Sequence, residues 1–216
     1  MKHIQKQNSP QFFEDWKVAN EVERPEKAAL KIWDKLQNPE KEQLRIHLLK
    51  EQGYLCCYCN QAIKNDPLRT KIEHLYPKDK EKYPERKFTY DNIMLACNGG
   101  ERDKPVVQHC DTKKGNNEPT AIHPLQLNCA EQFLYNALGE IDGISDEANT
   151  TISDLGLYID KLNTLRKIAI DTIIEEHLSK TDEDIAFELQ LLVTKIEEKF
   201  SPFCTAVYQF IKNNYT

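Results

Sequence analysis

Apolar side chains recur every three or four residues in the first fifty positions, a spacing that predicts helices. A first helix is expected over 10–18, and a second begins near Pro25. The third has the clearest ends, with Asn38 as its N-cap, Pro39 in its first position and Gly53 after its last turn. The apolar faces are formed by Phe12, Phe13 and Trp16 in the first helix, Leu30, Trp33 and Leu36 in the second, and Leu44 and Leu48 in the third.

The pattern changes over residues 54–119. Proline, glycine, asparagine and aspartate divide this stretch into short pieces, and two apolar runs, at 71–75 and 92–96, have the length of strands. Such a compact, loop-rich unit would struggle to hold together by burial of apolar surface alone. Five of the seven cysteines lie in it.

Regular patterning returns after Pro124. A hairpin is predicted over 132–141, a helix from Asp154 onward, and a later helix that Ser201 and Pro202 end before another begins. The three apolar stripes are Leu155, Ile159, Leu162 and Leu165; Leu189, Leu192, Ile196 and Phe200; and Phe203, Val207 and Phe210. We therefore divide the chain into an N-terminal helical segment (1–53), a core (54–119) and a hairpin plus C-terminal helical region (120–216).

Composition narrows the setting. The mean hydropathy is −0.68, and no apolar run approaches the roughly 18 residues that a membrane span requires. The first residues are polar and no apolar stretch follows them, unlike a secretory signal. We expect a soluble, cytoplasmic protein with no membrane partner.

The net charge of −6, taken over the whole chain, argues against a nucleic-acid partner, but it is unevenly distributed. Residues 1–49 carry a net charge of +1, residues 50–119 carry +2, and residues 120–216 carry −9. Local charge decides whether phosphate can approach a surface, so the middle segment is compatible with nucleic acid.

The cysteines indicate a metal site. A reducing compartment disfavours disulfides, so clustered cysteines there are first interpreted as metal ligands or catalytic thiols. Cys56 and Cys59 form a C-x-x-C half-site, and Cys97 and Cys110 are the nearby residues that could complete a tetrahedral structural zinc site.

Two alternatives stay open for these cysteines. Cys57 could exchange with Cys56 as the ligand, and buried free thiols could cluster by chance. A redox C-x-x-C is a poorer interpretation, because no thioredoxin-like arrangement of strand, motif and helix surrounds it.

Other residues of chemical interest lie in the same segment. Glu73 and His74 are neighbours on a predicted strand, so their side chains point to opposite faces and one could hold a metal while the other reaches a substrate. Asn92 begins the next predicted strand, and Asp111 follows Cys110 directly. In order, the segment contains C-x-x-C, E-H, N-x-x-x-x-C and C-D-x-x-K-G.

This order of motifs resembles the HNH endonucleases that have a zinc-stapled ββα-metal core. The likeness extends to residues 3–6 and 10–16, and to 72–78, 83–85, 92–99 and 133–139, which resemble the small HNH nucleases of retron and Septu-type bacterial defence systems. It covers most of the chain and is looser after residue 150. It implies an α+β fold with a ββα-metal core flanked by N-terminal and C-terminal helices.

The resemblance also implies roles for individual residues. His74 would be the general base, Asn92 would orient it, and Glu73 and Asp111 would hold a catalytic Mg²⁺ beside the structural Zn²⁺. Lys113 and Lys114 would contact phosphate. The implied substrate is nucleic acid, with DNA as the default, in defence against phage. The implied partners are an ABC-type ATPase and a retron reverse transcriptase with its non-coding RNA.

Several points stay open at this stage. Asp111 stands where the family usually has His or Asn, and His109 competes with it as a metal ligand or phosphate contact, although a half-exposed loop histidine is the simpler interpretation. RNA such as tRNA is an alternative substrate. A non-catalytic zinc module would need the cysteines but not His74, and a stand-alone housekeeping nuclease would need no ATPase.

Overall fold

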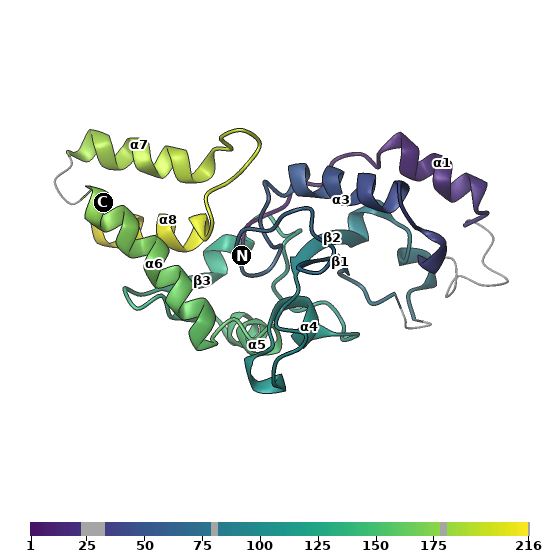
Figure 1. Ribbon diagram of the computed structural model, residues 1–216. Helices are drawn as coiled ribbons and strands as arrows, with labels where there is room; N and C mark the ends of the chain where they lie inside the picture. Colours follow the sequence, from purple (N-terminus) through teal and green to yellow (C-terminus); the bar gives the residue numbers. More distant parts are fainter. Residues whose placement is uncertain (23–32, 79–81, 178–180, 216) are drawn as a thin grey trace.

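The computed structural model describes residues 1–22, 33–78, 82–177 and 181–215. These residues form helices and two small antiparallel sheets, so the α+β class is confirmed (Figure 1). The helices are α1 (Gln11–Ala19), α3 (Glu40–Glu51), α4 (Cys110–Lys114), α5 (Asp146–Asp154), α6 (Asp160–His177), α7 (Asp182–Val193) and α8 (Cys204–Tyr215). The strands are β1 (Thr70–His74), β2 (Ile93–Cys97), β3 (Phe133–Tyr135) and β4 (Ile141–Gly143).

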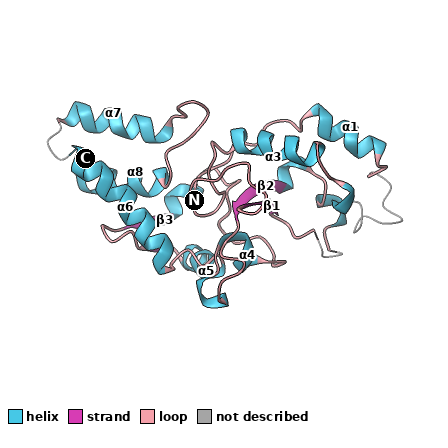
Figure 2. Cartoon of the chain, in the orientation of Figure 1, coloured by secondary structure: helices cyan, strands magenta, loops and turns pink. Residues whose placement is uncertain are grey.

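The sheet of β1 and β2 lies between two groups of helices. In Figure 1, α1 and α3 are on one side of it and α6, α7 and α8 gather on the other. Long loops connect these elements, and the strands occupy only small parts of the drawn chain (Figure 2). Within the described residues, no helix is both long and apolar enough to cross a membrane.

The two strand predictions in the middle segment are confirmed to within one residue. β1 and β2 pair antiparallel, with Thr70 opposite Cys97 and His74 opposite Ile93. All five residues of β2 are buried, which explains its unbroken apolar character. The short helix α4 packs against β2, so β1, β2 and α4 form one compact unit in chain order.

The N-terminal helices are confirmed in part. α1 buries Phe13 and Trp16, as its apolar face predicts. The expectation that Asn38 caps the third helix is wrong: α3 starts at Glu40, Pro39 takes the N-cap position, and no side chain caps it. The start of the second predicted helix lies outside the described residues, and Trp33–Lys35 forms a 3₁₀ turn that buries Trp33.

The hairpin prediction near residues 132–141 is confirmed by β3 and β4, which pair Tyr135 with Ile141. The helix predicted from Asp154 is wrong at its start, because Asp154 is the last residue of α5. Gly156 has φ +59°, and the Leu157 N–H donates to the Ile152 carbonyl, a Schellman ending that stops the helix. α6 starts only at Asp160.

The helix predicted through Phe200 is too long. α7 ends at Val193, and Ile196 pairs with Lys199 across a tight turn whose residues Glu197 and Glu198 have positive φ. The Phe200 N–H donates to the Gly53 carbonyl, so this turn attaches to the end of α3. Periodicity continues through the turn by coincidence, because Phe200 is apolar for packing outside a helix.

Two groups of buried apolar residues hold the chain together. The larger contains residues from all three predicted segments, among them Phe13, Tyr58, Leu95 and Leu155. The smaller joins α6, α7 and α8 to Leu55. The segments therefore share interior packing, and the boundary at residue 53 separates no independent core.

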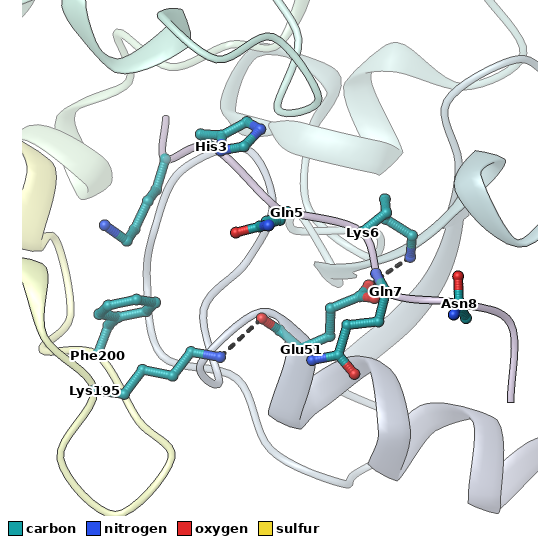
Figure 3. Close-up of a pocket in the computed structure, with 9 residues that line it drawn as sticks. His3, Gln5, Lys6, Gln7, Asn8, Glu51, Lys195 and Phe200 are labelled. Atoms are coloured by element: carbon teal, nitrogen blue, oxygen red, sulfur yellow. Dashed lines mark hydrogen bonds and ion pairs between the residues drawn. The ribbon is translucent and has the colours of Figure 1, made fainter.

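Glu51, at the end of α3, fixes the N-terminal segment. Its carboxylate accepts hydrogen bonds from Lys6 Nζ at 2.5 Å, the Gln7 N–H at 2.8 Å and the Tyr90 hydroxyl at 3.0 Å. Figure 3 shows Glu51 between Lys6 and Lys195, at a cavity of about 720 Å³. This largely buried ion pair ties the first residues to α3, and Lys6 Nζ also donates to the Ile93 carbonyl of β2 at 2.9 Å.

Candidate functional site

Four cysteine thiols from separate elements meet in the interior. Cys56 and Cys59 lie in one turn, Cys97 ends β2 and Cys110 begins α4. Their sulfur atoms all lie within 4.8 Å of one another, with Cys56 Sγ to Cys110 Sγ at 3.8 Å and Cys59 Sγ to Cys97 Sγ at 4.0 Å. Tetrahedral zinc with Zn–S bonds of about 2.3 Å places its sulfurs about 3.8 Å apart. The cluster is therefore compatible with structural zinc.

The surroundings of the cluster suit a thiolate site. The Cys97 N–H donates to Cys56 Sγ at 3.3 Å, an orientation that stabilises negative charge on sulfur. Burial opposes that charge, but hydrogen bonds from Cys110 and the other thiols bring the pKa of Cys56 well below its usual range. Thiolate is the form that binds metals.

Cys57 lies outside the cluster. Its N–H donates to the Leu95 carbonyl, and burial together with the neighbouring Cys56 raises the pKa of its thiol. Of the two residues that the sequence left open, the structure thus brings Cys56 to the other three thiols.

α4 connects this cluster to a cleft. Cys110 is its first residue, and the next, Asp111, lines a cleft of about 380 Å³ together with Glu73 and His74 of β1. Consecutive residues of one short helix therefore belong to the candidate metal centre and to the cleft that Glu73 and His74 also line.

Glu73 is buried at the inner wall of the cleft. Its Oε1 atom accepts hydrogen bonds from the Tyr58 hydroxyl at 2.7 Å and from Lys114 Nζ at 3.0 Å. Burial opposes its charge, but hydrogen bonding with Asp111 and the charge of Lys114 lower its pKa below the ordinary value. Glu73 is therefore the charged member of the pair.

Asp111 responds in the opposite direction. Burial and the adjacent Glu73 carboxylate raise the pKa of Asp111 to about 9. The two carboxylates share one proton at neutral pH, as closely spaced acids do. A divalent cation can replace such a proton, because it neutralises both charges at once.

His74 forms another wall of the cleft. Its Nε2 lies 3.1 Å from the Lys87 carbonyl, which can only accept, so Nε2 carries the proton and Nδ1 keeps a lone pair. The ring of Trp33 meets the imidazole edge-on at a centroid distance of 4.4 Å. Burial lowers the pKa of His74 to about 4, so the ring is neutral at pH 7.

Asn92 is fully buried and acts on the loop after β1. Its Nδ2 donates to the Tyr76 and Arg86 carbonyls at 3.0 and 2.9 Å, and its Oδ1 accepts from the Tyr76 N–H at 2.7 Å. The amide therefore fixes the backbone two residues beyond His74, and among the described residues its hydrogen bonds go to backbone groups and not to the imidazole.

The remaining sequence candidates have different surroundings. Lys114 is buried, and its ammonium donates to the His74 carbonyl at 3.1 Å as well as to Glu73. It occupies the interior beside the carboxylates, where a surface phosphate contact was expected. Lys113 is half-buried and does not line the cleft. His109 is buried with 2% of its surface exposed, so the interpretation as a half-exposed histidine is wrong; its Nδ1 faces the Val107 carbonyl at 3.4 Å.

Sequence reasoning missed the cleft residues that lie outside 54–119. Trp33 and the α3 residues Lys41 and Arg45 line the same cleft as His74. One signal was present in the sequence: Lys41 and Arg45 are like charges four positions apart, a pairing that an isolated helix disfavours.

The chain matches no protein-family model, and no curated protein is significantly similar to it. Function must therefore be argued from the cleft and the four-cysteine cluster.

Proposed function

We propose that this protein is a metal-dependent HNH endonuclease that hydrolyses phosphodiester bonds of nucleic acid, with DNA as its substrate. The observation that carries the proposal is the convergence of Glu73, His74 and Asp111 on one cleft beside four clustered thiols. Phosphodiester hydrolysis needs a general base to activate water and carboxylates that can hold a metal ion, and both kinds of group lie in this cleft.

His74 is the general base in this proposal. Its protonated Nε2 is engaged by the Lys87 carbonyl, which leaves the Nδ1 lone pair to accept a proton from the attacking water. Because the pKa of His74 is about 4, the imidazole is in its proton-accepting form throughout the neutral range. Asn92 holds the loop that follows, and so acts as a positioning residue.

Glu73 and Asp111 would hold Mg²⁺ in this proposal. The pair suits this ion, because Mg²⁺ is commonly bound by one or two carboxylates, with water and phosphate completing its shell, and it would replace the shared proton. When bound, the ion stabilises negative charge on the phosphate and the leaving 3′-oxygen. Lys114 keeps Glu73 ionised and in place through its 3.0 Å ion pair.

A structural Zn²⁺ would occupy the four-cysteine cluster. The ion would fix the start of α4, and so the position of Asp111, relative to β2. The cellular role follows the family resemblance: an effector of bacterial defence against phage, directed by an ABC-type ATPase. The acidic C-terminal region, with a net charge of −9, suits contact with a protein better than contact with DNA.

The test is cleavage of plasmid DNA and of total tRNA by the purified chain, with and without the ATPase. The wild type is compared with His74→Ala and with His123→Ala, which alters a half-buried histidine outside the cleft. Protein dialysed free of Mg²⁺ is then supplied with increasing Mg²⁺ while its zinc content is monitored. This order separates the two metals, which EDTA alone would not do.

Loss of cutting in His74→Ala, with cutting kept in His123→Ala and dependent on Mg²⁺, is the expected result. Cutting of tRNA but not plasmid would assign RNA as the substrate. If the wild type cuts neither substrate even with the ATPase, or if His74→Ala keeps full activity, the proposal fails. The non-catalytic zinc module then becomes the better interpretation, because it requires the cysteines alone.

A further inference from the structure

The cleft is lined by more cationic side chains than carboxyl groups. Lys71, which lines the cleft, is neutralised by Glu101 at 2.6 Å, and the buried Lys114, which does not line it, pairs with Glu73 at 3.0 Å. The other three cations that line the cleft, Lys41, Arg45 and Lys78, form no ion pair among the described residues. These three define what we call the cation cluster.

Arg45 is the unusual member of the cation cluster. Only 6% of its surface is exposed, and its Nε–H has no hydrogen-bond partner in the described part of the chain. A buried N–H without a partner is costly to a folded protein, so such groups are normally hydrogen-bonded. The charges of Glu42 and Asp66 act favourably on Arg45, but neither acid pairs with it: Glu42 accepts from Asn65, and Asp66 pairs with Arg69.

The neighbours of Arg45 increase this cost. Lys41 lies one turn earlier on the same face of α3, and like charges at that spacing repel. Burial lowers the pKa of Lys41, and the charges of Arg45 and Lys78 lower it further. Asp34 partly offsets these charges without pairing with Lys41. An anion placed among the three cations would relieve both the repulsion and the missing hydrogen bond.

The cation cluster also lies beside the proposed general base. The Lys78 ammonium is 5.8 Å from the centre of the Trp33 ring, and that ring contacts His74 edge-on. An anion held here would therefore be a neighbour of the imidazole within the same cleft of about 380 Å³.

We infer that Lys41, Arg45 and Lys78 form a phosphate-binding subsite that holds a backbone phosphate of the nucleic acid next to the one being cleaved. The inference rests on the proposed function, since the cleft would otherwise have no phosphodiester to position. The guanidinium offers the planar donor arrangement that suits phosphate, and the two ammonium groups add charge. Lys41 and Arg45 belong to α3, which lies outside the unit of β1, β2 and α4. The N-terminal segment would therefore take part in substrate binding.

The test measures binding separately from cleavage. A short fluorescein-labelled DNA duplex is titrated with the His74→Ala chain, in which we expect no cutting, over a series of salt concentrations. Arg45→Gln and Arg45→Met are added in this background, and Arg102→Gln serves as the matched control because it removes the same charge from an exposed position outside the cleft. Inorganic phosphate and a mononucleotide are titrated in parallel by calorimetry.

Both Arg45 variants are expected to bind the duplex about 10-fold more weakly, with a logarithmic salt dependence shallower by about 1, while Arg102→Gln changes neither. Their melting temperatures should stay the same or rise, because the substitution removes an unpaired buried charge. A lowered melting temperature in both variants would make Arg45 structural and overturn the inference. Arg45-dependent binding of phosphate or mononucleotide, with duplex binding unchanged, would also overturn it.

Cleavage by the same substitutions in the otherwise wild-type chain separates the two proposals. If the wild type cuts the duplex and Arg45→Gln cuts and binds as before, the subsite fails and the nuclease function stands. If the wild type does not cut but Arg45→Gln still weakens duplex binding, the phosphate subsite stands and the nuclease function fails.

Discussion

Asp111 and Glu73 share one proton, and this makes the stability of the fold depend on pH. The pKa of Asp111 is raised to about 9 in the folded chain, against 3.8 for an ordinary aspartate. The folded state therefore keeps a proton that the unfolded state has lost. Stability that this proton supplies is complete at acidic pH and declines as pH rises towards the folded pKa.

We predict that the Mg²⁺-free protein becomes less stable between about pH 6 and about pH 9, and that Asp111→Asn flattens this slope. The asparagine carries no titrating proton, and Glu73 keeps its ion pair with Lys114. Thermal melting of both proteins across this range, without divalent cations, is the measurement. Equal slopes for the two proteins would contradict the shared proton.

A matched pair of variants, Cys56→Ser and Cys57→Ser, tests which of the two cysteines is the zinc ligand. Cys56→Ser should reduce the zinc content from about one ion per chain to near zero, because a structural site needs all four thiolates. Cys57→Ser should keep its zinc and lose only about 1–3 kcal/mol, the cost of a poorly bonded buried hydroxyl. Metal analysis and melting of both variants check this. Zinc loss from Cys57→Ser instead would exchange the two assignments.

At the scale of elements, the structure shows which sequence signals were sufficient. β1 and β2 were recognisable because short apolar runs lay between turn-forming residues. The ending of α5 could have been found from Gly156, whose positive φ is a common helix stop. The excess length predicted for α7 could not have been avoided, since Phe200 continues the apolar spacing while packing in a loop.

The candidate site was predictable only where its residues were close in sequence to the cysteines. Glu73, His74 and Asp111 fall within the motif-bearing segment. Arg45 does not, because its part in the cleft depends on how α3 packs against β2, which is a long-range contact. Lys114 was predicted to contact phosphate, but it is buried against Glu73, a partner that local pattern does not reveal.

The Glu51 ion pair gives a prediction for the joint between α3, the N-terminal segment and the sheet. Glu51→Gln would leave the Lys6 ammonium buried without a counter-charge, and should lower the free energy of unfolding by about 3 kcal/mol. Glu198→Gln, which breaks the exposed pair with Lys50, should cost less than about 1 kcal/mol. Chemical denaturation of the two variants compares them. Similar losses would show that burial does not govern the Glu51 pair.

Across the whole molecule, burial is unevenly distributed among the elements. All five residues of β2 are buried, whereas α7 buries only Leu192. Apolar burial is the main source of local stability, so β2 and α7 should open at different free energies.

We predict that native-state hydrogen exchange is fast in α7, through local opening, and slow in β2, where it requires global unfolding. Mass spectrometry of peptides covering 182–193 and 93–97 measures this difference. Removing zinc should speed exchange in β2 far more than in α7, because Cys97 ends that strand. Uniform exchange along the chain would mean that the molecule opens as one unit.

Through the five residues of α4, the geometry of the cleft depends on the oxidation state of the clustered cysteines, although none of these cysteines lines the cleft. Cys110 belongs to the thiol cluster, Asp111 to the cleft, and Lys114 to the wall between them. An oxidant that took two electrons from each thiol pair to form disulfides would expel any bound zinc and draw Cys110 Sγ from 3.8 Å to about 2 Å from Cys56 Sγ. The start of α4 would shift with Cys110, so oxidative stress would alter the position of Asp111 against Glu73 without modifying any residue that lines the cleft.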